Sequence, residues 1–202
     1  IISTQMMETM IDNQVPTRAE VNDVANSIMD GADAVMLSGE TSVGKYPLEV
    51  IQQMRRIIES VENSPLISIP DQLVQCMNER FISKTICHQA ALMANAINAE
   101  VITTLTDSGY TAFQISSWRP KSNILVFSSN RRILAMLNLL WGVKGVYYNK
   151  FVSTDQTIED INNLAHERGY LNEGEFAVNI TSMPVKERGM ANTMRITEFG
   201  KG

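Results

Sequence analysis

The stretch from Pro16 to Pro47 constrains the fold more than any other part of the chain. Thr17 and Glu20 stand three residues apart, the spacing of a capping box, in which each side chain hydrogen-bonds the backbone amide of the other at a helix start. Apolar residues then recur at helical spacing, which predicts one buried helical face. These residues are Val21, Val24, Ala25 and Ile28.

The residues after this helix predict a tight turn and a strand. Gly31 can adopt the left-handed conformation that ends a helix, and the apolar run Ala34–Leu37 predicts a short strand buried on both faces. A second helix is predicted from Pro47 to about Glu62. Its predicted core-facing stripe consists of Leu48, Ile51, Met54, Ile58 and Val61.

Two β/α units are therefore predicted in residues 1–62. The first begins with a strand at residues 1–5 and a short helix at residues 6–11. A closed (β/α)8 barrel needs eight such units in about 250 residues. Residues 1–62 alone cannot form one.

The rest of the chain predicts a second α/β block after the Pro-containing connection at residues 64–71. Apolar residues from Ile86 to Ile97 follow helical spacing, and a later helix is predicted with Ser153 as its cap. The last two strands are joined by about ten residues without a helix, so they should pair antiparallel. The other predicted segments are strands 101–105, 124–127, 146–148, 176–181 and 192–197, and a helix at 131–141.

Three segments of the opening stretch resemble, in order, the signature of pyruvate kinases: Pro16–Asn26, Asp30–Thr41 and Gly44–Pro47. The resemblance implies an α/β fold, with the terminal part of a (β/α)8 barrel followed by a three-layer α/β/α pyruvate kinase C-terminal domain with a mixed sheet. The implied division is a partial barrel at 1–63, a linker and lead-in at 64–83, and the C-terminal domain at 84–202. The chain starts at Ile1 in mid-pattern, so we expect it to be a piece of a longer polypeptide.

The resemblance also implies an activity, the transfer of the phosphoryl group of phosphoenolpyruvate to ADP, giving pyruvate and ATP in glycolysis. It implies Mg²⁺ and K⁺ in the intact enzyme, allosteric control, and a cytoplasmic homo-oligomer, either a dimer or a tetramer. The Lys-x-Glu and Ala-Arg-Gly-Asp segments of the family would lie before Ile1. We therefore expect this fragment alone to be inactive and to bind no metal or other cofactor.

A nucleotide-binding P-loop is the alternative for residues 39–45, which fit Gly-x4-Gly-Lys after a predicted strand. A Walker loop requires Ser or Thr after the lysine to bind Mg²⁺, whereas Tyr46 and Pro47 follow here. Pro47 also removes a backbone amide from the start of the next helix. The sequence favours the pyruvate kinase interpretation.

The candidate catalytic residues follow the two predicted strands of the partial barrel, since barrel chemistry lies at the carboxyl ends of strands. By resemblance, Thr4 would help to pass a proton to the enolate through water, with Ser38 and Glu40 near the same mouth. From the residues alone, a strand-end threonine is more often a helix cap. Arg18 resembles the family arginine near a subunit contact, and without the resemblance it is equally a solvated helix charge.

A candidate effector site follows the strand at 101–105, where hydroxyls and amides can cradle an anion. It resembles the family loop that holds the phosphate of an allosteric sugar phosphate. Its residues are Thr106, Ser108, Gly109 and Thr111, with Lys186 and Arg188 from a later loop. The later loop is alternatively a mobile hairpin. Asp107 and Tyr110 replace residues that are often basic in members that respond to sugar bisphosphates.

Two other functions stay open for the chain as it stands. One is a standalone regulatory module that binds a sugar phosphate or AMP through residues 106–111. The other is a structural dimerisation domain in which neither site is used.

Composition excludes several classes of function. The net charge of −5 and pI near 5.1 give no basic surface for nucleic acid or anionic membranes, and no apolar run has the length of a membrane span. Cys76 and Cys87 lack disulfide or metal spacing, which fits a reducing, cytoplasmic interior. His88 and His166 have no partner at ligand spacing, so a zinc site is not expected.

Overall fold

The computed structural model describes residues 1–64, 80–150, 152–183 and 190–201, and the chain divides into two compact units, Ile1–Ser68 and Ile69–Gly202. The predicted connection at 64–71 lies almost wholly outside the described residues. Each unit has its own apolar core.

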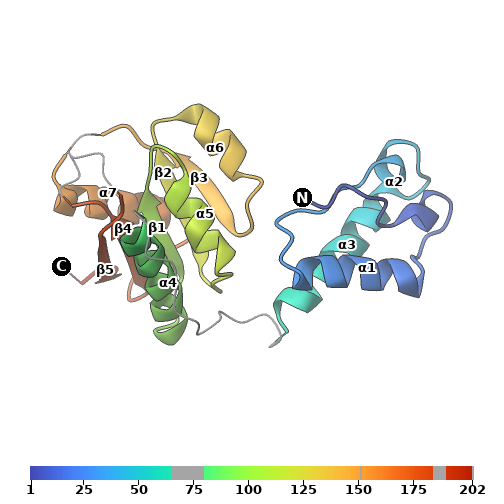
Figure 1. Cartoon of the computed structure of the whole chain (residues 1–202), viewed down its shortest axis with the longest axis horizontal. Helices are drawn as coiled ribbons and strands as arrows, with labels where there is room; N and C mark the ends of the chain where they lie inside the picture. Colours follow the sequence, from blue (N-terminus) through green and yellow to red (C-terminus); the bar gives the residue numbers. More distant parts are fainter. Residues whose placement is uncertain (65–79, 151, 184–189, 202) are drawn as a thin grey trace. The chain divides into compact units, whose positions relative to one another are not determined.

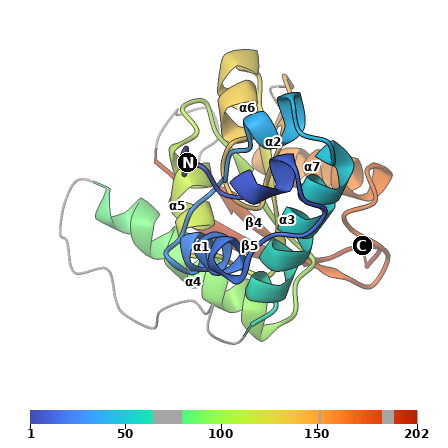
Figure 2. The same ribbon diagram turned by 90° about the vertical axis from the view of Figure 1, so that its right-hand side faces the viewer.

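The first unit is mainly helical (Figure 2). Its elements are the 3-10 helix η1 (Glu8–Ile11) and the helices α1 (Arg18–Met29), α2 (Gly39–Ser42) and α3 (Pro47–Glu62). The capping box predicted at Thr17 and Glu20 is confirmed, and Gly31 follows the helix at φ 91°. Between α1 and α3 lies a core of Met6, Met7, Met10, Val24, Val50, Met54 and Ile57.

The strand predicted at Ala34–Leu37, buried on both faces, is wrong for the described structure. The only pairing described there is one parallel bridge between Ile2 and Val35, and Met36 is 41% exposed. A parallel strand becomes buried when neighbouring strands and covering helices surround it. Within the described part of this unit, the two extended segments pair only with each other, so no neighbouring strand covers their other edges.

The core-facing stripe predicted on α3 is wrong in part. Met54 is buried as predicted, but Leu48 and Ile51 are 62% and 52% exposed. Val50 and Ile57 are buried instead. The described unit covers only the side of α3 that faces α1 and the residue 6–10 segment, so this contact decides which residues are buried.

The second unit is a five-stranded sheet between two helical layers, in strand order β3-β2-β1-β4-β5 (Figure 1). Its strands are β1 (Val101–Leu105), β2 (Asn123–Ser128), β3 (Val143–Tyr147), β4 (Phe176–Thr181) and β5 (Thr193–Glu198). Its helices are α4 (Phe81–Ala96), α5 (Tyr110–Ser117), α6 (Arg131–Leu137) and α7 (Thr154–Glu167).

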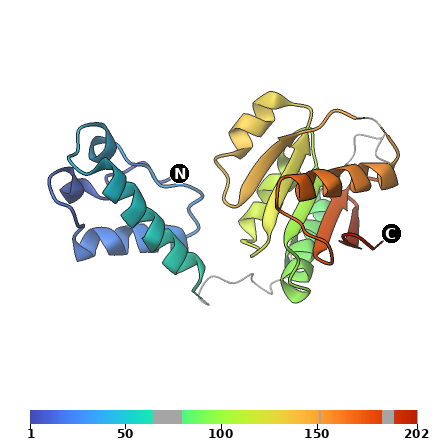
Figure 3. The same ribbon diagram turned by 180° about the vertical axis from the view of Figure 1, so that it is seen from behind.

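The predicted three-layer arrangement and mixed sheet are confirmed. Strands β1 to β4 pair in parallel, and β5 pairs antiparallel with β4. Residues of α4, α5 and α6 pack with Ile102, Ile124 and Val178 on one face of the sheet. Helix α7 packs with Val101 and Leu125 on the other face, which Figure 3 shows from behind.

The predicted bounds around β3 are wrong. Helix α6 ends at Leu137, not Trp141, and β3 starts at Val143, not Val146. The described strand includes Gly145, although glycine weakens strand interiors. The structure explains this glycine by close packing, since a Cβ there would lie 3.1 Å from Leu134 Cδ2 and 3.3 Å from the Leu134 carbonyl oxygen.

Candidate functional site

The first unit places Thr4 and the Ser38–Glu40 segment at the same end of the Ile2–Val35 bridge. Ile2 donates its amide to the Ala34 carbonyl at 2.9 Å and accepts from the Met36 amide at 3.1 Å. The two chain segments run parallel from there, so Thr4 and Ser38 leave on the same side. Both residues are exposed. Within the described part of this unit, no hydrogen bond joins the Thr4 side chain to Ser38 or Glu40.

Glu40 is the buried member of this group, with only 2% of its surface exposed. Its Oε2 accepts the Ser38 amide at 2.8 Å, and its Oε1 accepts the Met7 amide at 3.4 Å. Burial acts to raise the pKa of this carboxyl, but hydrogen bonds from backbone amides outweigh it and lower the pKa below the usual glutamate value. Those amides belong to Met6, Met7, Ser38 and Glu40 itself.

The loop at residues 39–45 does not have the geometry of a phosphate cradle. The Val43 and Gly44 amides both donate to the Gly39 carbonyl, and the Lys45 amide donates to the Ile11 carbonyl. The Lys45 ammonium group pairs with Asp12 at 2.8 Å. A P-loop needs its amides and lysine turned toward phosphate oxygens, whereas these groups are used within the protein.

Arg18 is the first residue of α1 and is exposed. Its position directly after the capping residue Thr17 fixes where its backbone lies, because the helix start is held by Glu20. Thr9 also donates its amide to Glu20, at 2.8 Å. The predicted role of Arg18 at a subunit contact stays a prediction.

The second unit brings Thr106, Ser108, Gly109 and Thr111 together in the turn between β1 and α5. Thr106 and Thr111 are buried, and Thr106 Oγ1 accepts the Gly109 amide at 3.0 Å. Gly109 has φ +80°, and a Cβ there would also lie 3.2 Å from Leu137 Cδ2. Both features make glycine necessary at this position.

This turn lies at the point where the strand order of the sheet reverses. From β1 the chain continues to β2 and β3 on one side, and β4 lies on the other side of β1. In open α/β sheets, ligands bind beyond the carboxyl ends of the strands at such a switch point. The candidate effector residues therefore lie where this fold commonly binds ligands.

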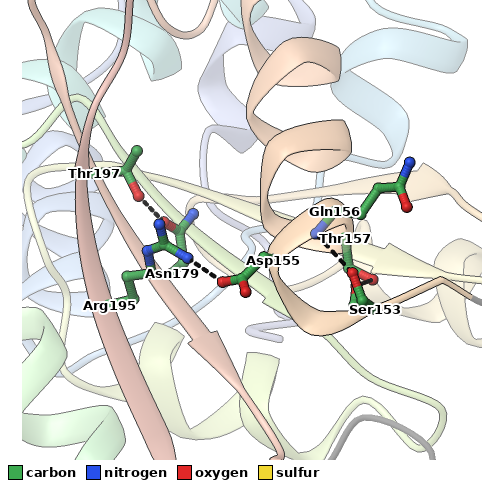
Figure 4. A network of polar contacts seen from close by, with 7 residues as sticks. All are labelled: Ser153, Asp155, Gln156, Thr157, Asn179, Arg195 and Thr197. Carbon is green, nitrogen blue, oxygen red and sulfur yellow. Dashed lines mark hydrogen bonds and ion pairs between the residues drawn. The ribbon is translucent and has the colours of Figure 1, made fainter. Parts of the chain in front are cut away.

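The α7 start and β5 form the other polar group near this edge (Figure 4). Arg195 Nη1 donates to Asp155 at 2.6 Å, and Ser153 Oγ accepts the Gln156 amide at 3.3 Å, as the predicted cap requires. Thr181, at the end of β4, is buried, and its hydroxyl has no hydrogen-bond partner in the described structure.

Lys186 and Arg188 lie outside the described residues, and so does Cys76. Both ends of the segment that contains Lys186 and Arg188 are described. Asn192 accepts the Met183 amide at 2.8 Å and donates to the Met183 carbonyl at 2.9 Å. This pair fixes how far apart the two ends of the segment lie.

Sequence reasoning missed two interactions in the second unit. Asn179 links the interior of the sheet to α7 and β5 through its side chain. An asparagine within the apolar strand at 176–181 was the signal for it, since buried polar groups need partners. The Arg80 guanidinium lies 4.4 Å from the centre of the Tyr110 ring. No sequence spacing indicates that contact.

Metal-ligand clusters and the Cys87 thiol are the other features that bear on chemistry. No cluster of three or more His, Cys, Asp and Glu side chains that could hold a metal ion occurs among the described residues. Burial raises the pKa of the Cys87 thiol to about 12, which makes it a poor nucleophile. None of the helices in the described ranges is long and apolar enough to cross a membrane.

Comparison with known proteins gives consistent matches along the chain. The family described as "Pyruvate kinase, alpha/beta domain" matches residues 84–197, and "Pyruvate kinase, barrel domain" matches residues 1–51. Pyruvate kinase 2 of Synechocystis is 39% identical over 88% of this chain, and pyruvate kinase of Clostridium acetobutylicum is 34% identical over 97%.

A solved structure agrees with these matches. The crystal structure of a pyruvate kinase from Cryptosporidium parvum superposes with a TM-score of 0.79 at 31% identity, and it covers 97% of this chain. The chain spans 29% of the Synechocystis protein, 41% of the Clostridium protein and 39% of the Cryptosporidium chain. The chain belongs to the pyruvate kinase family.

Proposed function

We propose that this chain acts as the carboxyl-terminal part of a full-length pyruvate kinase, with residues 1–63 completing its barrel, 64–83 as linker and lead-in, and 84–202 as its C-terminal domain. In the reaction, the bond between the phosphorus and the enol oxygen of phosphoenolpyruvate breaks, and the phosphoryl group moves to a terminal oxygen of ADP. The enolate left behind takes up a proton at carbon to become pyruvate. Family membership supports this proposal, and the shared position of Thr4, Ser38 and Glu40 carries it.

Thr4 would serve the proton step in this proposal. Thr4 is exposed at the end of the parallel bridge, where a water molecule bound to its hydroxyl would pass a proton to the enolate. Ser38 and Glu40 lie on the neighbouring segment at the same end. Mg²⁺ and K⁺ would neutralise phosphate charge in the intact enzyme, held by residues outside this chain. Positioning and neutralisation of charge supply most of the catalysis in phosphoryl transfer.

The experiment compares two proteins in one assay. Pyruvate formation from phosphoenolpyruvate and ADP, with Mg²⁺ and K⁺ present, is measured for the full-length polypeptide and for the 202-residue chain. We expect activity from the first and none from the second, because loss of a single charged catalytic group can lower the rate about 10³- to 10⁵-fold. An inactive full-length polypeptide would contradict the proposed function. Pyruvate formation by the purified chain would contradict the predicted inactivity of the fragment.

We also propose that residues 106–111 bind a phosphorylated effector, a sugar phosphate or AMP, with Lys186 and Arg188 contributing positive charge. The support is the location of the turn at the switch point of the sheet and its hydroxyl and amide groups. A binding site of this kind would also suit a standalone regulatory module. Homo-oligomerisation, with Arg18 near a subunit contact, and a cytoplasmic location belong to the same proposal.

Thermal unfolding of the 202-residue chain with fructose 1,6-bisphosphate, ribose 5-phosphate or AMP tests this site. Binding to the folded chain alone raises the midpoint as the ligand concentration rises. Thr106→Val should abolish that rise, because it removes the hydroxyl that orders Gly109. Ser117→Ala, at the far end of α5, is the matched control and should respond like the wild type. No rise with any of the three ligands would rule out effector binding by this chain.

A further inference from the structure

The strongest unexplained feature of the first unit is the buried carboxylate of Glu40. Its hydrogen bond to Met7 joins residues 33 positions apart in the sequence. Because the same carboxylate also accepts the Ser38 amide, one side chain links the segment after Thr4 to the segment that begins at Ser38. No ion pair of Glu40 occurs in the described part of the unit, so backbone amides alone balance its charge.

This environment makes Glu40 a poor proton donor near neutral pH. Hydrogen bonds from backbone amides stabilise the ionised form and lower the pKa. A general acid needs a pKa near the working pH. Both carboxylate oxygens accept from backbone amides, and only 2% of the residue is exposed, so the carboxylate is shielded from solvent in the described unit.

Thr4 lies between two fixed points of the chain. On one side, Ile2 makes two backbone hydrogen bonds to the segment at residues 34–36. On the other side, Met6 and Met7 are buried in the core, and the Met7 amide is held by Glu40. Only Ser3, Thr4 and Gln5 lie between these points, so their exposed side chains depend on both anchors.

We infer that Glu40 is a positioning residue that sets the distance between Thr4 and Ser38 and takes no part in proton transfer itself. This inference rests on the proposed function, since Thr4 matters only if it serves the proton step. A displacement of about 1 Å in a positioned group can lower a rate by roughly 100-fold. Loss of the Glu40 hydrogen bonds should therefore lower the turnover number and leave substrate binding nearly unchanged.

The test uses the full-length enzyme with Glu40→Gln, Thr4→Val, the double variant, and Glu59→Gln as an exposed control on α3. Glu40→Gln should lower kcat about 10- to 100-fold, with KM for both substrates within about twofold. In the Thr4→Val background it should cause no further loss, because a residue that acts through Thr4 has nothing left to position. Glu59→Gln should behave like the wild type.

Three kinetic results would overturn the inference while the proposed function stands. One is an active Glu40→Gln enzyme with the kcat of the Glu59→Gln control. Another is a double variant whose loss is the full product of the two single losses, since Glu40 would then act independently of Thr4. Disappearance of one limb of the kcat pH profile in Glu40→Gln would also contradict it, because it would identify Glu40 as the group that titrates.

A spectroscopic measurement on the 202-residue chain tests the same contact without activity. In the wild-type chain, the amide protons of Met7 and Ser38 should shift together during an acid titration, as protonation of Glu40 weakens both hydrogen bonds. This arm remains informative if the Glu40→Gln variant fails to fold. If the chemical shifts of the two amide protons changed with different midpoints, the two amides would not donate to the same carboxylate, and the inference would be contradicted.

Discussion

The side-chain amide of Asn179 donates a hydrogen bond to Thr103 Oγ1 at 2.7 Å, in the fully buried interior of the sheet. The same amide group donates to Asn162 of α7 at 2.8 Å. Asn179 Oδ1 accepts from Thr197 of β5 at 2.7 Å, a contact drawn in Figure 4. One side chain thus connects β1, β4, β5 and α7. Its side-chain nitrogen donates two hydrogen bonds and its side-chain oxygen accepts one.

Asn179→Ala should destabilise the second unit, because it leaves polar partners buried without hydrogen bonds. The expected loss in the free energy of unfolding is about 2 kcal/mol or more, since one unsatisfied buried group alone costs roughly 1–3 kcal/mol. Chemical denaturation followed by tryptophan fluorescence measures it, as both tryptophans lie in this unit. Asn163→Ala, at an exposed position of α7, is the control and should change stability by less than about 0.5 kcal/mol.

The first unit should lose stability in acid. Burial acts to raise the pKa of Glu20, but hydrogen bonds from Thr9 and Thr17 outweigh it and lower the pKa, as amides do for Glu40. A carboxyl whose pKa is lower in the folded state stabilises that state above its unfolded pKa, about 4.3. This stabilisation is lost as the pH falls through the folded pKa. The protection of residues 1–64 from hydrogen exchange, measured relative to the intrinsic exchange rate at each pH, should therefore fall between pH 7 and pH 3.

Glu20→Gln is the matched variant for that measurement. It should already be less stable at pH 7, and its exchange should depend less on pH than that of the wild type. Equal pH dependence in both proteins would show that Glu20 does not contribute.

Gly44 and Gly169 should respond differently to substitution. A Cβ at Gly44 would lie 2.3 Å from the Glu40 carbonyl oxygen, so Gly44→Ala must shift the backbone that holds Glu40. We expect a cost of about 1–3 kcal/mol in the free energy of unfolding. Gly169 has φ +76° with nothing within 4 Å, so Gly169→Asn should cost little because asparagine tolerates the left-handed conformation. Thermal unfolding measures both variants: a lower midpoint is expected for Gly44→Ala, from steric overlap, and a nearly unchanged midpoint for Gly169→Asn.

Asn192→Asp should weaken the contact between Met183 and Asn192, the two residues that flank positions 184–191. The variant keeps an acceptor for the Met183 amide but turns a carboxylate oxygen toward the Met183 carbonyl, where the Asn192 amide now donates. Asn192→Ala removes both hydrogen bonds and should cost about 1 kcal/mol or more. Faster exchange of the Met183 amide in both variants is the expected result, and unchanged exchange in Asn192→Ala would contradict it.

The sequence by itself determined the order of the five strands in the second unit and the two long helices of the first. Local signals were sufficient where they act within a few residues, as at the Thr17–Glu20 capping box, the Ser153 cap and Gly31. The apolar runs at 101–105 and 176–181 predicted buried strands with correct bounds. The short connection before β5 predicted its antiparallel pairing.

Tertiary structure alone decided which of those residues are buried and what the polar ones contact. Met36, Leu48 and Ile51 have the spacing of core residues, yet their exposure depends on which elements surround them. The Glu40–Met7 and Asn179–Asn162 hydrogen bonds join residues far apart in the sequence, and no local pattern encodes such pairs. The candidate catalytic residues were identified from the sequence. The hydrogen bonds from the Met7 and Ser38 amides to Glu40 form only when the two extended segments fold side by side.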